Sequence, residues 1–524
     1  MKIKSLLIGM LASTAFVACT NENEPVINEQ EGVVLSKSYV AVNVVTPKGA
    51  EGRAAADDFE AGSTDEVAVN GAVFLYLDAN MNGCAAPYYV AGEKLSWADA
   101  NGLGQDQKAN VLVVDEAKEV PSYIVAVLNP VGGANHGYTA STTLAELKAT
   151  HATYTAYTNS NFVMTNAVYR AANGKEAAAT PVPVDKIHSS ETEAVADPVT
   201  IFVERVVGKV AVTGLDAAAK GWENKEQLDD QESKALELVI TGWEVLQNNE
   251  SALIKNIDLK WNHAWWNDVT LQRSYWANDY VAAGRTAYLV DDMETPQAGF
   301  RYVEETVSQT ANTAEGANVN PYLLVTGKFV DAETKEAVNL VEWRGRKYTM
   351  EGYLNFIAGN SKISQYWTKS GDTYTEFAAE LLEMVDDPDT DWKAEAKLKD
   401  ANTQFYTCTF NPDGTVAKGT PVETSVVAAA IAEFGEVQYW NGGRTYYYTP
   451  IKHQTVGTDN FYGVVRNHVY KVSISAISGY GTPVANPEQA IEIPEKPTDD
   501  KSYLAADVVI LDWKVVLNEN VELN

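Results

Sequence analysis

Short apolar segments, separated by polar and glycine-rich ones, run through almost the whole chain. In residues 33–45 the positions alternate, and Val40, Val42 and Val44 fall on one face, as in a strand with one buried face. Residues 73–77 and 124–128 are instead continuously apolar, which is typical of strands inside a two-sheet sandwich. The pattern therefore predicts an all-β fold of β-sandwiches with minor helices.

The same criteria predict most of the remaining elements. Strands are expected at residues 69–77, 110–114, 123–128, 199–207, 209–212, 236–240, 469–477 and within 504–517. One helix is expected after Thr373 and Glu376, whose spacing forms a capping box ahead of apolar residues at helical spacing up to Val385. A shorter helix is expected at about 425–434, with Thr424 as N-cap and Gly435 as a left-handed stop.

The composition limits the class of protein. The 524 residues fit three or four domains of average size or two large all-β domains, and a boundary near residue 245 is plausible. With 45% hydrophobic residues, the chain is too apolar for a disordered acidic protein. A formal charge of −31 repels phosphate backbones, and no Lys/Arg run interleaves with aromatic residues. We therefore expect no nucleic-acid partner.

The first residues are typical of a secretory leader. Lys2 and Lys4 precede a largely apolar run, residues 6–17, that is too short to span a bilayer. The sequence Phe16-Val17-Ala18-Cys19 resembles a bacterial lipobox. It predicts a signal peptide at residues 1–18 and lipidation of Cys19, which gives a lipid-anchored precursor at the outer membrane. The alternative is an ordinary secretory signal cut near Ala18, with Cys19 incidental.

The remaining cysteines, Cys84 and Cys408, lie far apart in the sequence and are as readily buried and free as bridged, so no disulfide framework is expected. The common nucleophile, zinc, phosphate-loop and dinucleotide motifs are absent from the sequence. Asp387, Asp389 and Asp391 have the spacing that opens a calcium loop, but Trp392 and Leu398 stand where glycine and glutamate are needed. We expect neither an enzyme, nor a metal site, nor a cofactor.

Two groups of aromatic residues could stack on sugar rings, although packing in a core or on a strand face is the favoured interpretation. They are Trp261, Trp265, Trp266, Tyr275, Trp276 and Tyr280, and Tyr446, Tyr447 and Tyr448. The sugar interpretation supports a second hypothesis, an outer-membrane glycan-binding lipoprotein. Such proteins are mostly helical, which the alternating Val- and Thr-rich segments do not favour.

The two ends of the chain together suggest strand exchange. Residues 50–58 are small and charged, as in an exposed link, and they contain Arg53, the first arginine in the chain. Cleavage between Arg53 and Ala54 would release the 33–45 strand and open a groove edged by unpaired backbone groups, which a strand of another chain could fill. The last run places five apolar residues on one face, namely Val509, Leu511, Trp513, Val515 and Leu517. Each feature taken singly has an ordinary interpretation. Arg53 is then a surface residue of a linker, and the last strand is an edge strand of its own sandwich.

Several segments, taken in order, resemble the short-fimbria fimbrillins of type V pili. They are Asn161-Phe162-Val163-Met164-Thr165-Asn166, Val203-Glu204-Arg205-Val206-Val207-Gly208-Lys209-Val210, Arg273-Ser274-Tyr275-Trp276-Ala277, Tyr462-Gly463-Val464-Val465-Arg466-Asn467-His468-Val469-Tyr470-Lys471-Val472, Gly479-Tyr480-Gly481-Thr482-Pro483 and Leu511-Asp512-Trp513-Lys514-Val515-Val516. The resemblance implies two transthyretin-like Greek-key β-sandwich domains at residues 54–245 and 246–524. It also implies a lipoprotein precursor whose propeptide, residues 19–53, carries the removable strand, and a donor strand at residues 504–517.

The resemblance further implies cleavage after Arg53 by an Arg-specific, gingipain-like protease. The partners expected from it are like subunits in a homopolymer, fimbrial anchor and tip subunits, and host or bacterial surface receptors. The mature protein would lie in a cell-surface fimbrium that supports adhesion and biofilm formation. A removable first strand together with a long last strand favours a stalk subunit over a tip subunit, which lacks a donor, or an anchor, which keeps its first strand.

Overall fold

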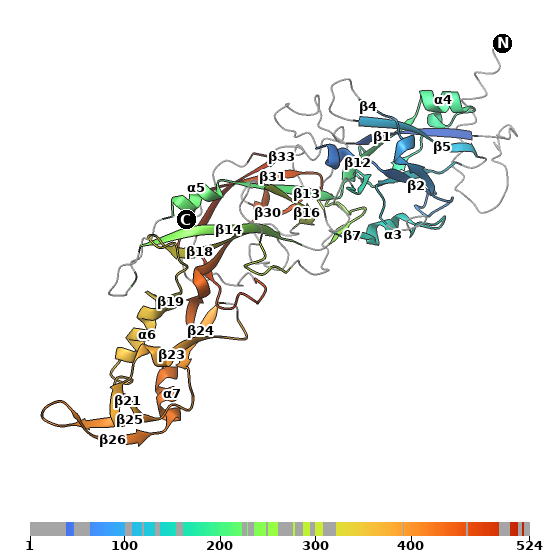
Figure 1. Ribbon diagram of the computed structural model, residues 1–524. Helices are drawn as coiled ribbons and strands as arrows, with labels where there is room; N and C mark the ends of the chain where they lie inside the picture. The colour runs from blue at the N-terminus through green and yellow to red at the C-terminus, as the bar shows by residue number, and fades with distance from the viewer. Residues whose placement is uncertain are drawn as a thin grey trace, which may run out of the picture.

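The computed structural model describes residues 38–46, 63–99, 107–117, 120–131, 137–153, 161–222, 228, 235–247, 250–259, 276–277, 287–293, 299–307, 321–390, 392–456, 459–491, 503–511 and 516–517. Over these residues the molecule is elongated (Figure 1). A sheet built from the first part of the chain lies at one end, two further sheets occupy the middle, and a lobe lies at the other end. Strands dominate all three parts, which confirms the prediction of an all-β sandwich fold.

The N-terminal sheet has nine strands. Its order is β3 (Tyr88–Ala91), β2 (Gly71–Leu77), β6 (Tyr123–Leu128), β8 (Met164–Asn166), β12 (Val199–Arg205), β1 (Ser38–Thr46), β5 (Gln107–Ala117) and β4 (Trp97–Asp99), with β11 (Thr180–Pro181) paired to β6. Three short helices accompany it: α2 (Thr64–Val67), α3 (Leu144–Ala149) and α4 (Glu191–Ala196). Every residue of β2 is buried, as its continuous apolar run predicts.

The middle of the molecule contains two larger sheets. One has the order β16 (Gly299–Glu304), β13 (Val207–Thr213), β31 (Val469–Ser478), β33 (Tyr503–Leu511) and β34 (Val516–Leu517). The other has the order β14 (Leu236–Leu246), β18 (Tyr322–Asp331), β28 (Arg444–Pro450) and β32 (Thr482–Pro483). Side chains of both sheets, with Leu215, Ala218 and Ala219 of α5 (Leu215–Lys220), share one core that is separate from that of the N-terminal sheet.

Smaller ladders complete these two parts. They are β7 (His151–Thr153) with β15 (Glu250–Ala252), β9 (Tyr169–Arg170) with β10 (Glu176–Ala177), and β17 (Thr306–Val307) with β30 (Asp459–Val464) and β29 (Lys452–Val456). The β7–β15 ladder pairs residues from either side of position 245. Strands therefore cross between the two predicted domains.

The lobe is an insertion between two neighbouring strands. β18 and β28 are antiparallel partners, with Lys328 opposite Arg444, yet the chain between them forms two sheets and a core of its own. One sheet contains β20 (Arg346–Thr349), β19 (Leu340–Trp343), β27 (Val437–Trp440), β24 (Lys393–Leu398) and β23 (Leu382–Asp386). The other contains β22 (Thr373–Glu376), β21 (Tyr366–Ser370), β25 (Phe405–Phe410) and β26 (Val416–Val422), and α6 (Met350–Gly359) and α7 (Thr424–Ala432) pack with them.

The predicted helix after Thr373 is wrong. Thr373–Glu376 forms β22, which makes a hairpin with β21, and the turn between them uses Gly371 at φ +60°. The following residues form a short 3-10 turn, Ala379–Leu381, and then β23. The apolar spacing fitted a helix, but cross-strand pairing in the hairpin and the sheet outweighed it because β-branched Thr373 and Thr375 and the aromatic Tyr374 suit a strand.

The second predicted helix is confirmed as α7, with a different cap. Glu423 is its N-cap and makes no side-chain capping bond, while the Thr424 hydroxyl donates to the Thr403 carbonyl at 2.7 Å. Gly435 has φ +74°, so the left-handed stop is confirmed. The longer helix α6, capped by the Thr349 hydroxyl, was not predicted.

Candidate functional site

The first strand, β1, is an interior strand of the N-terminal sheet. It pairs antiparallel with β5 from Ser38 to Thr46, and parallel with β12 from Val42 to Val45. Val40 and Val42 are fully buried and Val44 is 1% exposed, so the predicted apolar face is confirmed. Ala41, on the opposite face, is also buried. β1 therefore contributes to the core as well as to the backbone ladder.

Losing β1 would leave two strands, β5 and β12, without their shared neighbour. The three valines alone account for roughly 5–9 kcal/mol of gross burial, as an upper bound. The backbone groups of β5 and β12 that face β1 would lose their ladder partners, and such edges are templates for another strand. We call the position of β1, between β5 and β12, the β1 seat.

The residues predicted for processing lie on either side of β1 in the sequence, and the structure does not describe them. Cys19, Arg53 and Ala54 lie outside the described residues, as do Trp513 and Val515. The described chain ends at Thr46 after β1 and resumes at Ser63. The predicted cleavage bond therefore lies in the stretch that connects β1 to the rest of the N-terminal sheet.

The last strand lies in its own chain's sheet. β33 pairs antiparallel with β31, from Val469 opposite Leu511 to Ser478 opposite Tyr503. β34 returns on β33, with Val509 opposite Leu517. β33 and β34 end the five-stranded sheet in the middle of the molecule, and β1 lies in the nine-stranded sheet. The structure therefore shows residues 503–511 paired within their own chain, apart from the β1 seat.

One stretch of chain connects the β1 seat with the sheet that contains β33. β12, which borders β1, ends at Arg205, and β13 begins at Val207 after a single buried valine. β13 then pairs parallel with β31, the strand that borders β33. The neighbours of the first and last strands are thus joined directly in sequence.

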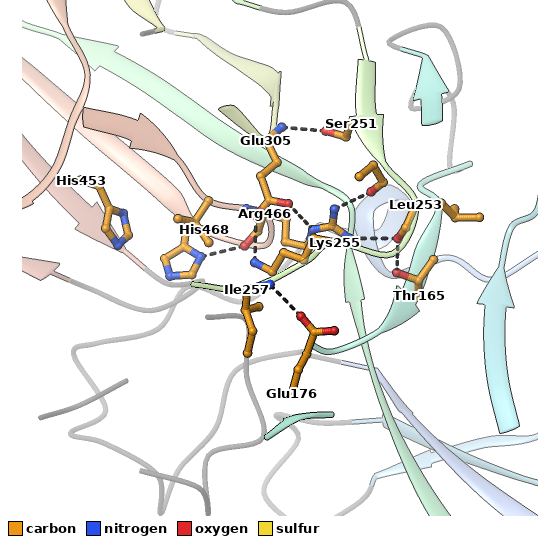
Figure 2. A network of polar contacts seen from close by, with 12 residues as sticks. Thr165, Glu176, Ser251, Leu253, Lys255, Ile257, Glu305, His453, Arg466 and His468 are labelled. Carbon is orange, nitrogen blue, oxygen red and sulfur yellow. Dashed lines mark hydrogen bonds and ion pairs between the residues drawn. The ribbon is translucent and has the colours of Figure 1, made fainter. Parts of the chain in front are cut away.

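A buried ionic cluster holds the junction between these parts (Figure 2). Glu305 accepts from Arg466 Nε at 2.7 Å and from Lys255 Nζ at 2.8 Å. The three side chains are at most 5% exposed. Arg466 Nη1 also donates to the Leu253 carbonyl at 3.0 Å, which accepts from Thr165 Oγ1 at 2.8 Å. The cluster therefore connects residues of the middle sheets with β8 of the N-terminal sheet.

The electrostatics of the cluster follow from its burial. Burial alone would raise the pKa of Glu305, but the cations of Arg466 and Lys255 lower it below its ordinary value. Burial lowers the pKa of Lys255, although Glu305 opposes the shift. A buried carboxylate with two cations can be stable only while all three partners are present. We interpret the cluster as a structural junction rather than a reactive site.

Sequence reasoning did not identify this junction. Arg466 lies in a segment that supported the resemblance, but Lys255 and Glu305 carry no local signal, and they approach it only through the fold. His468 Nδ1 lies 2.8 Å from the Arg466 carbonyl, and His453 Nδ1 lies 2.8 Å from the Tyr470 hydroxyl. Both imidazoles are buried beside the cluster (Figure 2).

The other candidate residues are structural where they are described. Trp276 is 1% exposed and packs against His453, and Tyr446 and Tyr447 are buried, so the core interpretation is confirmed for these three. The remaining aromatic residues of 261–280 lie outside the described residues. Cys408 is a free cysteine, so it is not bridged to Cys84. In the described ranges no three His, Cys, Asp or Glu side chains gather to hold a metal ion, and no helix could cross a membrane.

Several solved structures are similar to the chain, and three of them follow with their organism, identity and coverage. A putative cell adhesion protein from Parabacteroides distasonis ATCC 8503 is 12% identical, with 91% of this chain and 97% of that chain covered and a TM-score of 0.40. A fimbrial assembly protein from the same organism is 9% identical, covering 92% and 100%, with a TM-score of 0.28. The tip fimbrial protein Mfa3 from Porphyromonas gingivalis, with a C-terminal truncation, is 12% identical, covering 91% and 100%, with a TM-score of 0.29. These TM-scores are too low for the likenesses to add to a family assignment.

A family model matches the C-terminal part of the chain. No curated protein matches the sequence. Residues 438–519, which include β28, β31 and β33, match the family described as major fimbrial subunit protein type IV, Fimbrillin, C-terminal. This match confirms that the last part of the chain resembles the fimbrillin family.

Proposed function

We propose that the chain is a structural subunit, and specifically the stalk pilin, of a surface fimbria that polymerises by protease-triggered donor-strand exchange. The observation that supports this most strongly is the position of β1. It is an interior strand with buried valines, and the chain that follows it contains Arg53. A strand so integral to the core, yet joined to the rest by a link with a protease site, is suited to controlled removal.

In this proposal the precursor is lipidated at Cys19 and held at the outer membrane. An Arg-specific protease cuts between Arg53 and Ala54, and residues 19–53 leave with β1. The mature subunit then comprises residues 54–245 and 246–524 as two β-sandwich domains. β13 and β14, from the first range, pair with strands of the second, and the β7–β15 ladder also joins the two ranges. Its partners are like subunits along the stalk, anchor and tip subunits at its ends, and surface receptors through which the fimbria supports adhesion and biofilm formation.

The incoming strand in this proposal is residues 504–517 of another subunit. In its own chain most of this segment is already paired with β31, so exchange trades one backbone ladder for another rather than ordering a free tail. Each ladder hydrogen bond is worth about 1 kcal/mol net, so that trade is nearly balanced. The face that fills the β1 seat supplies the gain, because its Leu511, Trp513 and Leu517 are bulkier than the valines of β1. Val509 and Val515 complete this face.

The experiment uses two variants in cells that produce the fimbria. Arg53→Ala should leave full-length lipoprotein that does not polymerise, and deletion of residues 504–524 should stop assembly while both domains stay folded. Arg346→Ala, at an exposed arginine of β20, is the matched control and should assemble normally. Normal polymers from either test variant would overturn the proposal.

A conservative variant separates the processing enzymes. Arg53→Lys removes the site of an Arg-specific protease but keeps one for a general trypsin-like enzyme. Unprocessed Arg53→Lys protein would support the Arg-specific enzyme, and normal processing would contradict that part of the proposal. The dominance of strands in the described residues argues against the glycan-binding lipoprotein, which should be mostly helical.

A further inference from the structure

The first described element after the predicted cleavage bond is α2, and its Glu66 is fully buried. Glu66 forms a capping box with Ser63, whose backbone N–H donates to Glu66 Oε2 at 2.7 Å. The other carboxylate oxygen, Oε1, faces different elements. It accepts from the Tyr302 hydroxyl at 2.7 Å and lies 2.9 Å from Lys209 Nζ. A capping residue of so short a helix is thus bound to distant strands as well.

The partners of Glu66 lie where β12, which borders β1, continues into β13, which borders β31. Lys209 is on β13, and Tyr302 is opposite it on β16. Arg205, the last residue of β12, donates from Nε to the Glu66 carbonyl at 2.7 Å and from Nη1 to Asn467 Oδ1 at 3.0 Å. Glu66 therefore contacts the strand that borders β1 and the strand that borders β31.

The segment has a second, separate attachment. Asn129 Oδ1 accepts from the Asn70 backbone N–H at 2.7 Å, and Asn129 Nδ2 donates to the Ala68 carbonyl at 2.8 Å. Asn129 has φ +49° and is 3% exposed. The chain is thus held at Glu66 and again at Ala68 and Asn70, just before β2 begins at Gly71.

We propose that Glu66, with Lys209, Tyr302 and Arg205, forms a retention clamp that keeps the new N-terminal segment on the junction when β1 leaves. The cleavage sets which residues depart, and the clamp would limit fraying of the new terminus to residues upstream of Ser63 and preserve the edge of β12. This inference rests on the proposed cleavage after Arg53. The capping box can form without the contacts of Glu66 with β13 and β16, and so can the pairing of β1 with its neighbours. These contacts therefore call for a separate explanation.

The clamp matters most after cleavage. In the uncut chain, residues upstream of Ser63 are tethered by β1, so opening of α2 releases only a closed loop with limited extra freedom. In the cut chain the same residues end in a free terminus, and termini fray unless they are tied down. Opening of α2 is therefore easier once β1 is gone, and the contacts of Glu66 become the main restraint on the new terminus.

The test compares amide hydrogen exchange of the full-length chain before and after treatment with an Arg-specific protease. The reporter amides are those of Ser63, Glu66 and Val67, whose N–H groups are bonded within the capped turn. Asn70, bonded to Asn129, is the internal reference. In the unsubstituted chain all four amides should stay protected after residues 38–46 are released.

The variants are Glu66→Ala and Glu66→Gln, with Glu237→Ala as control because Glu237 forms an exposed ion pair with Lys335. Glu66→Ala should speed exchange of the reporter amides at least tenfold after cleavage, with Asn70 unchanged, and the reporter amides of the cut variant should be less protected than those of the uncut variant. Glu66→Gln should give an intermediate effect because its amide oxygen can still accept from Tyr302. Tyr302→Phe removes only one hydrogen bond and serves if Glu66→Ala does not fold.

The outcomes separate the clamp from the proposed function. Reporter amides that stay protected in cleaved Glu66→Ala, or that are equally protected in the cut and uncut variant, would overturn the clamp. For Tyr302→Phe, unchanged exchange after cleavage would do the same. If the protease does not release residues 38–46 from the unsubstituted chain, the proposed function fails, and the clamp fails with it.

Discussion

Val42 of β1 lies opposite Val199 of β12 in a parallel pair. On the other edge of β1, Val42 lies opposite Val111 of β5 in an antiparallel pair. β5 and β12 therefore run in opposite directions, and any strand in the β1 seat is parallel to one and antiparallel to the other. The β5 ladder covers β1 from end to end, whereas the registered β12 ladder covers only Val42 to Val45. A replacement strand that runs in the direction of β1 keeps the longer, antiparallel border, which is the more stable type of pairing.

Shortening a β1 side chain should destabilise the precursor. Val42→Ala should lower its free energy of unfolding by about 2 kcal/mol, because two fully buried methyl groups are lost and the cavity does not fill completely. Urea unfolding measures this, with Val239→Ala as control because Val239 is 40% exposed. After an Arg-specific protease has released β1, the Val42→Ala difference should vanish. An unchanged unfolding midpoint in the precursor would show that β1 is not integral to the core.

Removing the acid of the buried junction should destabilise the chain far more than breaking a surface ion pair. Glu305→Gln leaves Lys255 and Arg466 as two uncompensated buried cations, so the expected loss is about 3–5 kcal/mol. Lys335→Met, which breaks the exposed pair with Glu237, should change stability little. Calorimetry on the full chain makes the comparison. Equal effects of the two variants would contradict the structural role of the junction.

The pH dependence of stability should have an acid limb from Glu66 and Glu305. Burial opposes ionisation of both, but Tyr302 and Lys209 for Glu66, and Arg466 and Lys255 for Glu305, lower each pKa below its ordinary value of 4.5. A lowered pKa in the folded chain means that the unfolded chain binds more protons in acid. The stabilisation is therefore complete above about pH 5.5 and is lost as the pH falls through the folded-state values.

The double variant Glu66→Gln, Glu305→Gln tests this dependence. Its free energy of unfolding should be lower near neutral pH, and it should change less between about pH 5.5 and pH 3 than that of the unsubstituted chain. Urea unfolding across this range provides the measurement. The same acid slope in both proteins would assign the acid limb to other carboxylates.

The lobe should be dispensable for folding of the rest. Glu342 of β19 and Gln438 of β27 are directly paired, so an Asn-Gly turn can replace residues 343–437 and close a hairpin. The middle core keeps its own residues at the root of the lobe, Leu340 and Trp440, because the lobe core is separate. Circular dichroism and thermal unfolding should show a folded strand-rich chain with one cooperative transition. Failure to fold would show that the lobe is an integral part of the middle sheets.

Strands with strong local signals could be predicted from the sequence. The continuously apolar runs at 73–77 and 124–128 became fully buried parts of β2 and β6, because they had no polar face to expose. The alternating valines of β1 also predicted its buried face correctly. Residues 373–385 fitted a helix equally well by spacing, but the pairing of β22 with β21 and of β23 with β24, together with the β propensity of Thr373 and Thr375, selected strands.

The polar contacts of the candidate site could not be predicted in the same way. Glu66 meets Tyr302 across 236 positions, and Arg466 meets Glu305 across 161. Taken alone, Glu66, Glu305 and Arg466 resemble ordinary surface charges, and only the packing of separate sheets buries them beside their partners. The residues predicted for processing could, in contrast, be identified from local sequence. Arg53 and Cys19 were identified by sequence alone, and their roles stay predictions.

The most direct test of strand exchange is N-terminal sequencing and intact mass of protein sheared from the cell surface, with the same sample run on an SDS gel with and without boiling. Strand exchange after processing predicts a chain that begins at Ala54 and forms an SDS-resistant ladder only when it is not boiled. A single acylated species that begins at Cys19 and forms no ladder would contradict it.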